Sequence, residues 1–148
     1  MLKKTCPHCK ATYATAESCE DRFDRCLSLE FGDRAYWPVH HLTVLCYMLQ
    51  HNAYNHGAWL EARQLLAQFV NHDGASSNWH RQKALDSKSR LEQQSLLAGK
   101  KFADFQRITW SFTIADVRLE EAGLYCADVK NWANHLLQDT QPFTKNRE

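Results

Sequence analysis

Two cysteines separated by two residues, Cys6 and Cys9, lie near the N-terminus of this 148-residue chain. The Cys-x-x-Cys spacing serves two chemistries, because it forms either one half of a tetrahedral zinc site or the dithiol of a redox protein. In thioredoxin-like proteins the pair opens a helix directly after a buried strand, and only residues 1–5 precede Cys6 here. The chain also has no later β-branched runs to supply a central sheet. The sequence therefore favours a zinc knuckle over residues 1–16.

A tetrahedral zinc site needs two further ligands. Cys19 is the natural third ligand, because it lies in the first turn of a predicted helix whose N-terminus favours a thiolate. Cys26 lies roughly 10 Å further along the same helix and is too far away to share the ion. The fourth ligand is therefore sought among the histidines of the second predicted helix, which are His40, His41 and His51.

The choice of fourth ligand depends on how the first two helices cross. A short connection favours an antiparallel hairpin, which sets Cys19 opposite His51. His40 lies on the same face of the second helix but roughly 16 Å before His51, and it takes the role if the helices cross steeply. The predicted zinc ligands are thus Cys6, Cys9, Cys19 and His51, with His40 as the alternative. The structural alternative is that Cys19 fills the core and His51 interacts with the carbonyl end of its own helix.

Hydrophobic periodicity predicts an all-α fold, a single-domain bundle of about five helices. The helical domain is expected to span residues 1–139, including the N-terminal knuckle, and a flexible tail to span 140–148. Helices are expected over residues 17–31, 38–51, 58–70, 79–98 and 113–137.

Local signals mark the ends of these helices. Gly32 is expected just past the end of the first helix, and Pro38 suits the first position of the second. Thr113 and Asp116 form a variant capping box that is expected to begin the last helix. The apolar stripe of this helix consists of Tyr125, Val129, Trp132 and Leu136. The histidines outside the proposed site are expected at exposed or capping positions: His8, His72, His80 and His135.

Charge and hydropathy restrict the partners. The formal net charge of +1 gives no global electrostatic reason to expect nucleic acid. Only residues 81–107 are locally basic, and acidic residues interrupt them without an aromatic platform on which bases would stack. No stretch approaches the roughly 20 apolar residues of a membrane span, and no signal-peptide pattern follows the first residues. We therefore expect a cytoplasmic protein with reduced cysteines, no membrane contact and no nucleic-acid partner.

Further motifs are spread over most of the chain. They are Glu30-Phe31-Gly32-Asp33 with Ala35-Tyr36, Val39-His40-His41-Leu42-Thr43-Val44 with Tyr47, Gln50 and His51, Thr113 with Ala115-Asp116-Val117, and Trp132-Ala133. Together with the Cys-x-x-Cys start, this pattern resembles an uncharacterised bacterial family known only as a domain of unknown function. Leu45 stands where that family commonly has Asp, and Asn52 where it has Pro. The resemblance implies the same ligand choice and a bacterial cytosolic setting, and it supplies no activity.

Two functions of different classes are compatible with these residues. The first is a small zinc-stabilised helical module that binds an unidentified protein partner, since three thiolates and one imidazole leave no open metal position. The alternative is a metal-dependent enzyme or thiol-handling protein with an open zinc position near His40 or His41. The sequence shows no carboxylate pair, nucleophile elbow, phosphate loop or His-Glu-x-x-His motif. It therefore favours the binding module with structural Zn²⁺ and leaves the question of an enzyme open.

Overall fold

The computed structural model describes residues 4–96 and 101–144. Within these residues the chain forms five α-helices and one short β-ribbon, which confirms the predicted all-α bundle. The elements are β1 (Lys4–Thr5), β2 (Thr12–Tyr13), α1 (Cys19–Gly32), α2 (His40–Gln50), α3 (His56–Asn71), α4 (Ser77–Leu96) and α5 (Ala122–Thr140). Short 3₁₀ turns lie between or after them: η1 (Trp37–Val39), η2 (Phe105–Arg107), η3 (Ile114–Asp116) and η4 (Gln141–Phe143).

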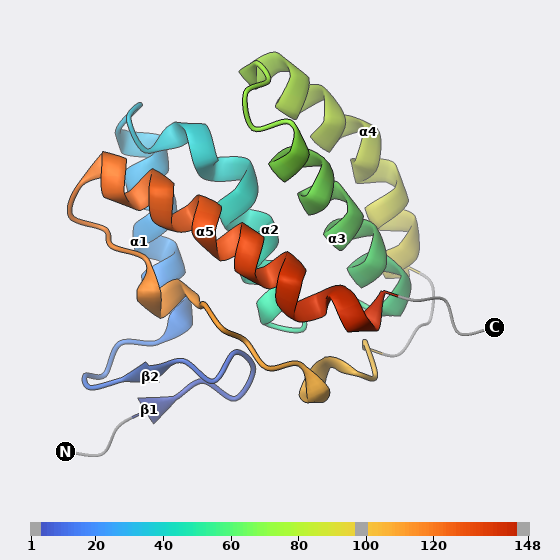
Figure 1. Cartoon of the computed structure of the whole chain (residues 1–148), viewed down its shortest axis with the longest axis horizontal. Helices are drawn as coiled ribbons and strands as arrows, with labels where there is room; N and C mark the ends of the chain where they lie inside the picture. The colour runs from blue at the N-terminus through green and yellow to red at the C-terminus, as the bar shows by residue number, and fades with distance from the viewer. Residues whose placement is uncertain (1–3, 97–100, 145–148) are drawn as a thin grey trace.

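The helices pack as two neighbouring pairs with α5 lying across them (Figure 1). Helices α3 and α4 lie side by side, and α2 contacts both α3 and α5. The ribbon of β1 and β2 lies beside the N-terminal end of α1 (Figure 1). Helix α2 runs back along α1, so that its last turn approaches the first turn of α1. This is the antiparallel hairpin that the short connection predicts.

The core draws on α1, α2, α3 and α5, and its largest side chains lie on α3 and α5. Trp59, Phe69, Tyr125 and Trp132 are among the largest fully buried side chains. All four residues of the predicted α5 stripe are buried, which confirms that prediction. Each fully buried side chain of this size contributes roughly 1.5–3 kcal/mol, so the bundle has a substantial core of its own.

The prediction that the last helix begins at Thr113 is wrong. The capping box does form, because the Thr113 amide donates to Asp116 at 2.9 Å and the Thr113 hydroxyl accepts from the Ala115 amide at 3.3 Å. It caps only the turn η3, and α5 begins at Ala122. The guanidinium of Arg22 on α1 donates a hydrogen bond to the carbonyl of Ile114 at 2.8 Å and another to the carbonyl of Val117. These side-chain bonds draw the backbone out of a helical path.

Smaller differences concern the other helix ends. Gly32 is the last residue of α1, and Asp33 caps the helix in an extended conformation. Pro38 lies in the turn η1 rather than at the start of α2. The predicted end of the fourth helix at residue 98 lies outside the described residues. At the C-terminus, α5 ends at Thr140, past the expected helix end at residue 137, and the turn η4 follows it.

None of the helices in residues 4–96 and 101–144 is both long enough and apolar enough to cross a membrane.

Candidate metal centre

A tight turn at the tip of the β-ribbon holds the first two cysteines. β1 and β2 pair antiparallel with Thr5 opposite Thr12, and the Cys6 amide donates to the Ala11 carbonyl at 2.8 Å. Lys10 closes the turn with a φ of 68°, in the left-handed region, and its amide donates to the Cys6 carbonyl at 3.1 Å. The Cys-x-x-Cys pair therefore lies in a turn. In a redox dithiol the activated thiol lies instead at the start of a helix.

The third cysteine is the first residue of α1. Ser18 caps this helix, with its hydroxyl accepting from the Asp21 amide and the Asp21 carboxylate accepting from the Ser18 amide, both at 3.1 Å. This reciprocal capping box fixes the position of Cys19 at the positive end of the helix dipole. The Cys19 sulfur lies 3.6 Å from the sulfur of Cys9.

The last turn of α2 supplies an imidazole. His51 Nδ1 donates to the Tyr47 carbonyl at 2.7 Å, and the two rings stack with centroids 4.1 Å apart. This hydrogen bond leaves Nε2 as the unprotonated nitrogen of the neutral ring. Nε2 is buried and has no hydrogen-bond partner among the residues that the structure describes. A second hydrogen bond that fixes the tautomer and ring orientation is the usual arrangement for a metal-binding histidine.

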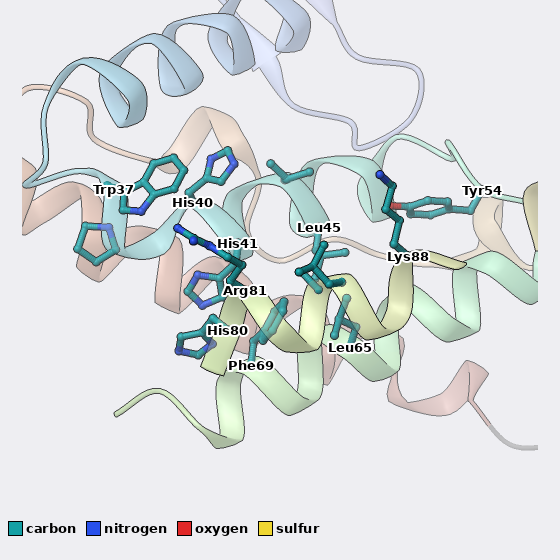
Figure 2. A pocket seen from close by; sticks show the side chains of 14 residues that line it. Trp37, His40, His41, Leu45, Tyr54, Leu65, Phe69, His80, Arg81 and Lys88 are labelled. Carbon is teal, nitrogen blue, oxygen red and sulfur yellow. The ribbon is translucent and has the colours of Figure 1, made fainter. Parts of the chain in front are cut away.

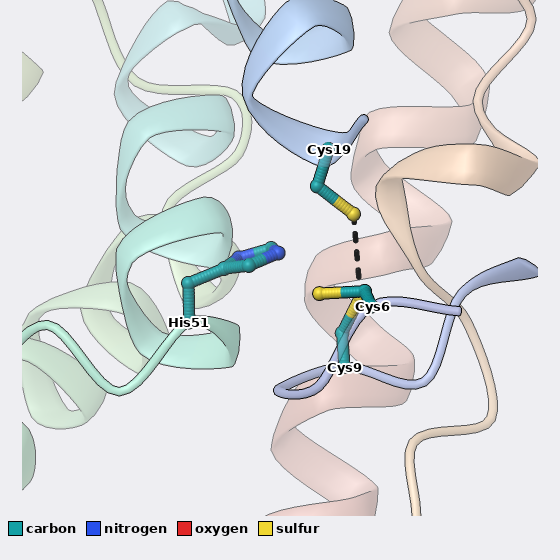
Figure 3. A group of neighbouring side chains, drawn as sticks. All are labelled: Cys6, Cys9, Cys19 and His51. Carbon is teal, nitrogen blue, oxygen red and sulfur yellow. Dashed lines mark hydrogen bonds between the residues drawn. The ribbon is translucent and has the colours of Figure 1, made fainter. Parts of the chain in front are cut away.

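The four side chains converge from three elements (Figure 3). One ligand atom from each of Cys6, Cys9, Cys19 and His51 lies within 4.8 Å of the others. Ligands at about 2.0–2.3 Å from a central ion in a tetrahedron lie roughly 3.3–3.8 Å from one another. The 3.6 Å between Cys9 and Cys19 falls within that range. Small side-chain rotations are therefore enough to bring all four donor atoms onto one metal ion.

Electrostatics favour a thiolate at this point. Hydrogen bonding from Cys9, with smaller contributions from His51 and Tyr13, lowers the pKa of Cys19 to about 4 despite the burial of its sulfur. The same hydrogen bond raises the pKa of Cys9, and burial raises the pKa of the Tyr13 hydroxyl, which lies 3.0 Å from the Cys19 sulfur. These contacts favour the thiolate form of Cys19 over that of Cys9. A divalent cation held by all three sulfurs would displace the thiol protons of Cys6 and Cys9.

The alternative ligand His40 lies in a different cluster. Its Nδ1 is 2.7 Å from a carboxylate oxygen of Glu30, whose side chain is fully buried. The Thr43 hydroxyl donates to the other oxygen at 2.6 Å, and the Tyr125 hydroxyl also donates to it. His41 stacks on His80 at a centroid distance of 4.1 Å. The structure therefore brings His51, and not His40, to the three cysteines.

Two features of these clusters were missed from the sequence. Tyr13 was not considered as a hydrogen-bond donor to Cys19, and no local signal marks that role. Glu30 did have a signal, because it falls on the buried stripe of its helix four residues after Cys26. His80 was expected at an exposed or capping position, but it is only 9% exposed and that expectation is wrong. Its ring packs against Phe69 and His41 on neighbouring helices.

Fold and site together define a small helical protein with a Cys₃His cluster between a β-ribbon and the helical bundle. The chain belongs to the family of unknown function DUF5946, whose family model matches residues 4–141. This membership confirms the resemblance found in the sequence motifs. No curated protein and no solved structure matches the chain.

Proposed function

We propose that Cys6, Cys9, Cys19 and His51 bind one structural Zn²⁺ ion. The observation that carries this proposal is the buried Nε2 of His51, which has no partner among the described residues and faces three sulfur atoms within 4.8 Å. A buried nitrogen without a hydrogen bond is costly, and a metal ion satisfies it. Thiolate and imidazole ligands in a compact tetrahedral group are the set that zinc prefers.

The donor count favours a structural role over catalysis. Three sulfurs and one nitrogen fill a tetrahedral sphere, so no position remains for water or substrate. The ion would fasten the β-ribbon to the first turn of α1 and the last turn of α2. Each strand of the ribbon is only two residues long, and an isolated two-stranded ribbon is marginally stable, so a metal would supply stability that the ribbon lacks.

We further propose that the zinc-stabilised bundle is an interaction module for a protein partner in the bacterial cytoplasm. Free thiols and a thiolate-rich site suit a reducing compartment. An exposed aromatic cluster supports the interaction role. Phe31 is 68% exposed, Trp37 is 39% exposed, and their ring centroids lie 5.3 Å apart at the end of the bundle opposite the cysteines. Exposed aromatic side chains of this kind dominate the binding energy of many protein interfaces.

Metal retention tests the zinc proposal. The purified protein should carry one zinc ion per chain, and Cys19→Ser should lose it during dialysis against a chelator. Cys126→Ser is the matched control, because Cys126 is a partly exposed thiol that lies on α5 outside the cluster. Equal zinc content in the two variants would contradict the proposal.

Co-purification tests the interaction role separately. A partner recovered with the native chain should be lost with Phe31→Ser and retained with Leu124→Ser. Leu124 is an exposed apolar side chain on α5, so its replacement controls for a general loss of surface hydrophobicity. Retention of the partner by both variants would show that the aromatic cluster is not the interface.

A further inference from the structure

A cavity of about 500 Å³ lies between α2, α3 and α4, away from the cysteine cluster (Figure 2). Its floor is apolar and aromatic, formed by Leu45, Leu65 and Phe69, with Trp37 toward one end and Tyr54 toward the other. Cavities of roughly 300–1,000 Å³ with mainly apolar walls and few polar groups are typical of small-molecule sites. The volume and the walls therefore suit a compact organic molecule.

The charged groups at this cavity all have one sign. Arg81 and Lys88 line it from α4, two turns apart on the same side of the helix. No acidic side chain is among the described residues that line the cavity. Figure 2 shows Arg81 toward the Trp37 end of the cavity and Lys88 toward the Tyr54 end. An anionic group on a bound molecule would be attracted to Arg81 or to Lys88, whereas a cationic group would be repelled by both.

A buried histidine supplies a polar group inside the cavity. His80 lines it, is 9% exposed, and has a buried Nδ1 without a hydrogen-bond partner among the described residues. Burial lowers the pKa of His80 and that of its stacking neighbour His41, the latter to about 4, so both rings are neutral at pH 7. Neutral imidazoles offer hydrogen bonds without charge. The two stacked imidazoles of His41 and His80 therefore extend the uncharged wall of the cavity.

We propose that this cavity binds a small amphipathic anion, a molecule with an apolar body and one carboxylate or phosphate group. The apolar body packs on Leu45, Leu65 and Phe69, and the anionic group pairs with Arg81 or Lys88. This inference is independent of the zinc site, because no ligand of the metal lines the cavity.

A pair of fluorescent probes tests the proposal. Anilinonaphthalene sulfonate carries an apolar aromatic body and one negative charge, and N-phenyl-naphthylamine has the same body without the charge. We expect the zinc-loaded protein to bind the sulfonate at one site per chain, about tenfold more tightly than the amine, since one or two partly exposed ion pairs contribute that much. Equal affinity for the two probes would overturn the anion preference.

Variants on α4 locate the binding. The double variant Arg81→Met and Lys88→Met should weaken sulfonate binding about tenfold and leave amine binding unchanged. Lys83→Met is the matched control, because Lys83 lies on the same helix over the Trp79 ring and does not line the cavity. Ala84→Trp should fill the cavity and abolish binding of both probes with the helical circular dichroism intact. Sulfonate binding that survives Ala84→Trp, or that falls equally with Lys83→Met, would overturn the proposal.

Competition distinguishes the two head groups. Decanoate and decyl phosphate should each displace the sulfonate probe at lower concentrations than uncharged decanol, and the stronger of the two identifies the preferred group. Displacement by decanol at the same concentration as both anions would contradict a charge-selective site.

Discussion

His40 at the start of α2 and His51 at its C-cap have different roles in this structure, and a pair of alanine variants should separate them. His51 contributes one of four donors in the proposed zinc site. Structural zinc binding in small domains is worth roughly 10–16 kcal/mol, so one ligand accounts for about 2.5–4 kcal/mol. His51→Ala should therefore bind zinc about a hundred- to a thousand-fold more weakly. Without metal, the variant should lose the hydrogen bond to the Tyr47 carbonyl, which is worth about 0.5–1.5 kcal/mol, and the stacking on the Tyr47 ring.

His40→Ala should show the reverse behaviour. The substitution removes one of three donors to the fully buried carboxylate of Glu30. Loss of a hydrogen bond to a buried charged group costs about 1.5–3 kcal/mol of folding free energy. Zinc affinity should stay within about twofold of the wild type, since His40 lies outside the cysteine cluster.

Two measurements on each variant complete this test. Zinc affinity is measured by competition with a chromophoric chelator, and folding free energy by urea unfolding of the metal-free protein. A His40→Ala variant that loses zinc affinity as strongly as His51→Ala would refute the assignment of the fourth ligand. A His40→Ala variant of unchanged stability would refute the account of the Glu30 network.

Three further outcomes are expected. Zinc removal by a chelator should lower the melting temperature while the helical circular dichroism persists, because the metal fastens the ribbon and the bundle has its own core; an unchanged melting curve after verified removal contradicts this. Asp128→Asn should lower the free energy of unfolding by about 1.5–3 kcal/mol, since the guanidinium and backbone amide of Arg118 both donate to the Asp128 carboxylate and keep its pKa below the usual 3.8. In the wild type this stabilisation is present above pH 3.8 and is lost as the pH falls through the lower pKa of the folded state. An acid-unfolding transition that is equally steep in the variant would contradict this role of Asp128. Burial lowers the pKa of His41 from 6.5 to about 4, so as the pH falls the unfolded chain binds a proton at this position before the folded chain does. The free energy of unfolding measured in urea should therefore decrease between pH 6.5 and pH 4. His41→Gln should make this decrease smaller, and the same pH dependence in the variant would contradict a buried neutral ring.

The cluster of Cys6, Cys9, Cys19 and His51 could be predicted from the sequence because short segments of the chain bring these residues together. The Cys-x-x-Cys spacing fixes the turn, and the helix that follows places Cys19 in its first turn. The short connection between α1 and α2 selects the antiparallel hairpin, which brings His51 rather than His40 to the cysteines. None of these steps needs knowledge of the remaining helices.

The features that were missed depend on contacts between distant parts of the chain. The start of α5 was misplaced because Arg22 bonds a carbonyl 92 residues away and holds the segment after η3 in a non-helical path. The buried carboxylate of Glu30 is acceptable only because His40, Thr43 and Tyr125 donate to it from two other helices. A sequence pattern marks such a residue as unusual but does not identify its partners.

The coordination sphere of the metal tests the central claim most directly. X-ray absorption at the zinc edge of the purified protein should show three sulfur ligands at about 2.3 Å and one imidazole nitrogen at about 2.0 Å. His51→Ala should lose the nitrogen contribution, and His40→Ala should give the wild-type spectrum. An oxygen ligand in the wild-type sphere, or a spectrum that changes with His40→Ala instead, would contradict a closed structural site built from Cys6, Cys9, Cys19 and His51.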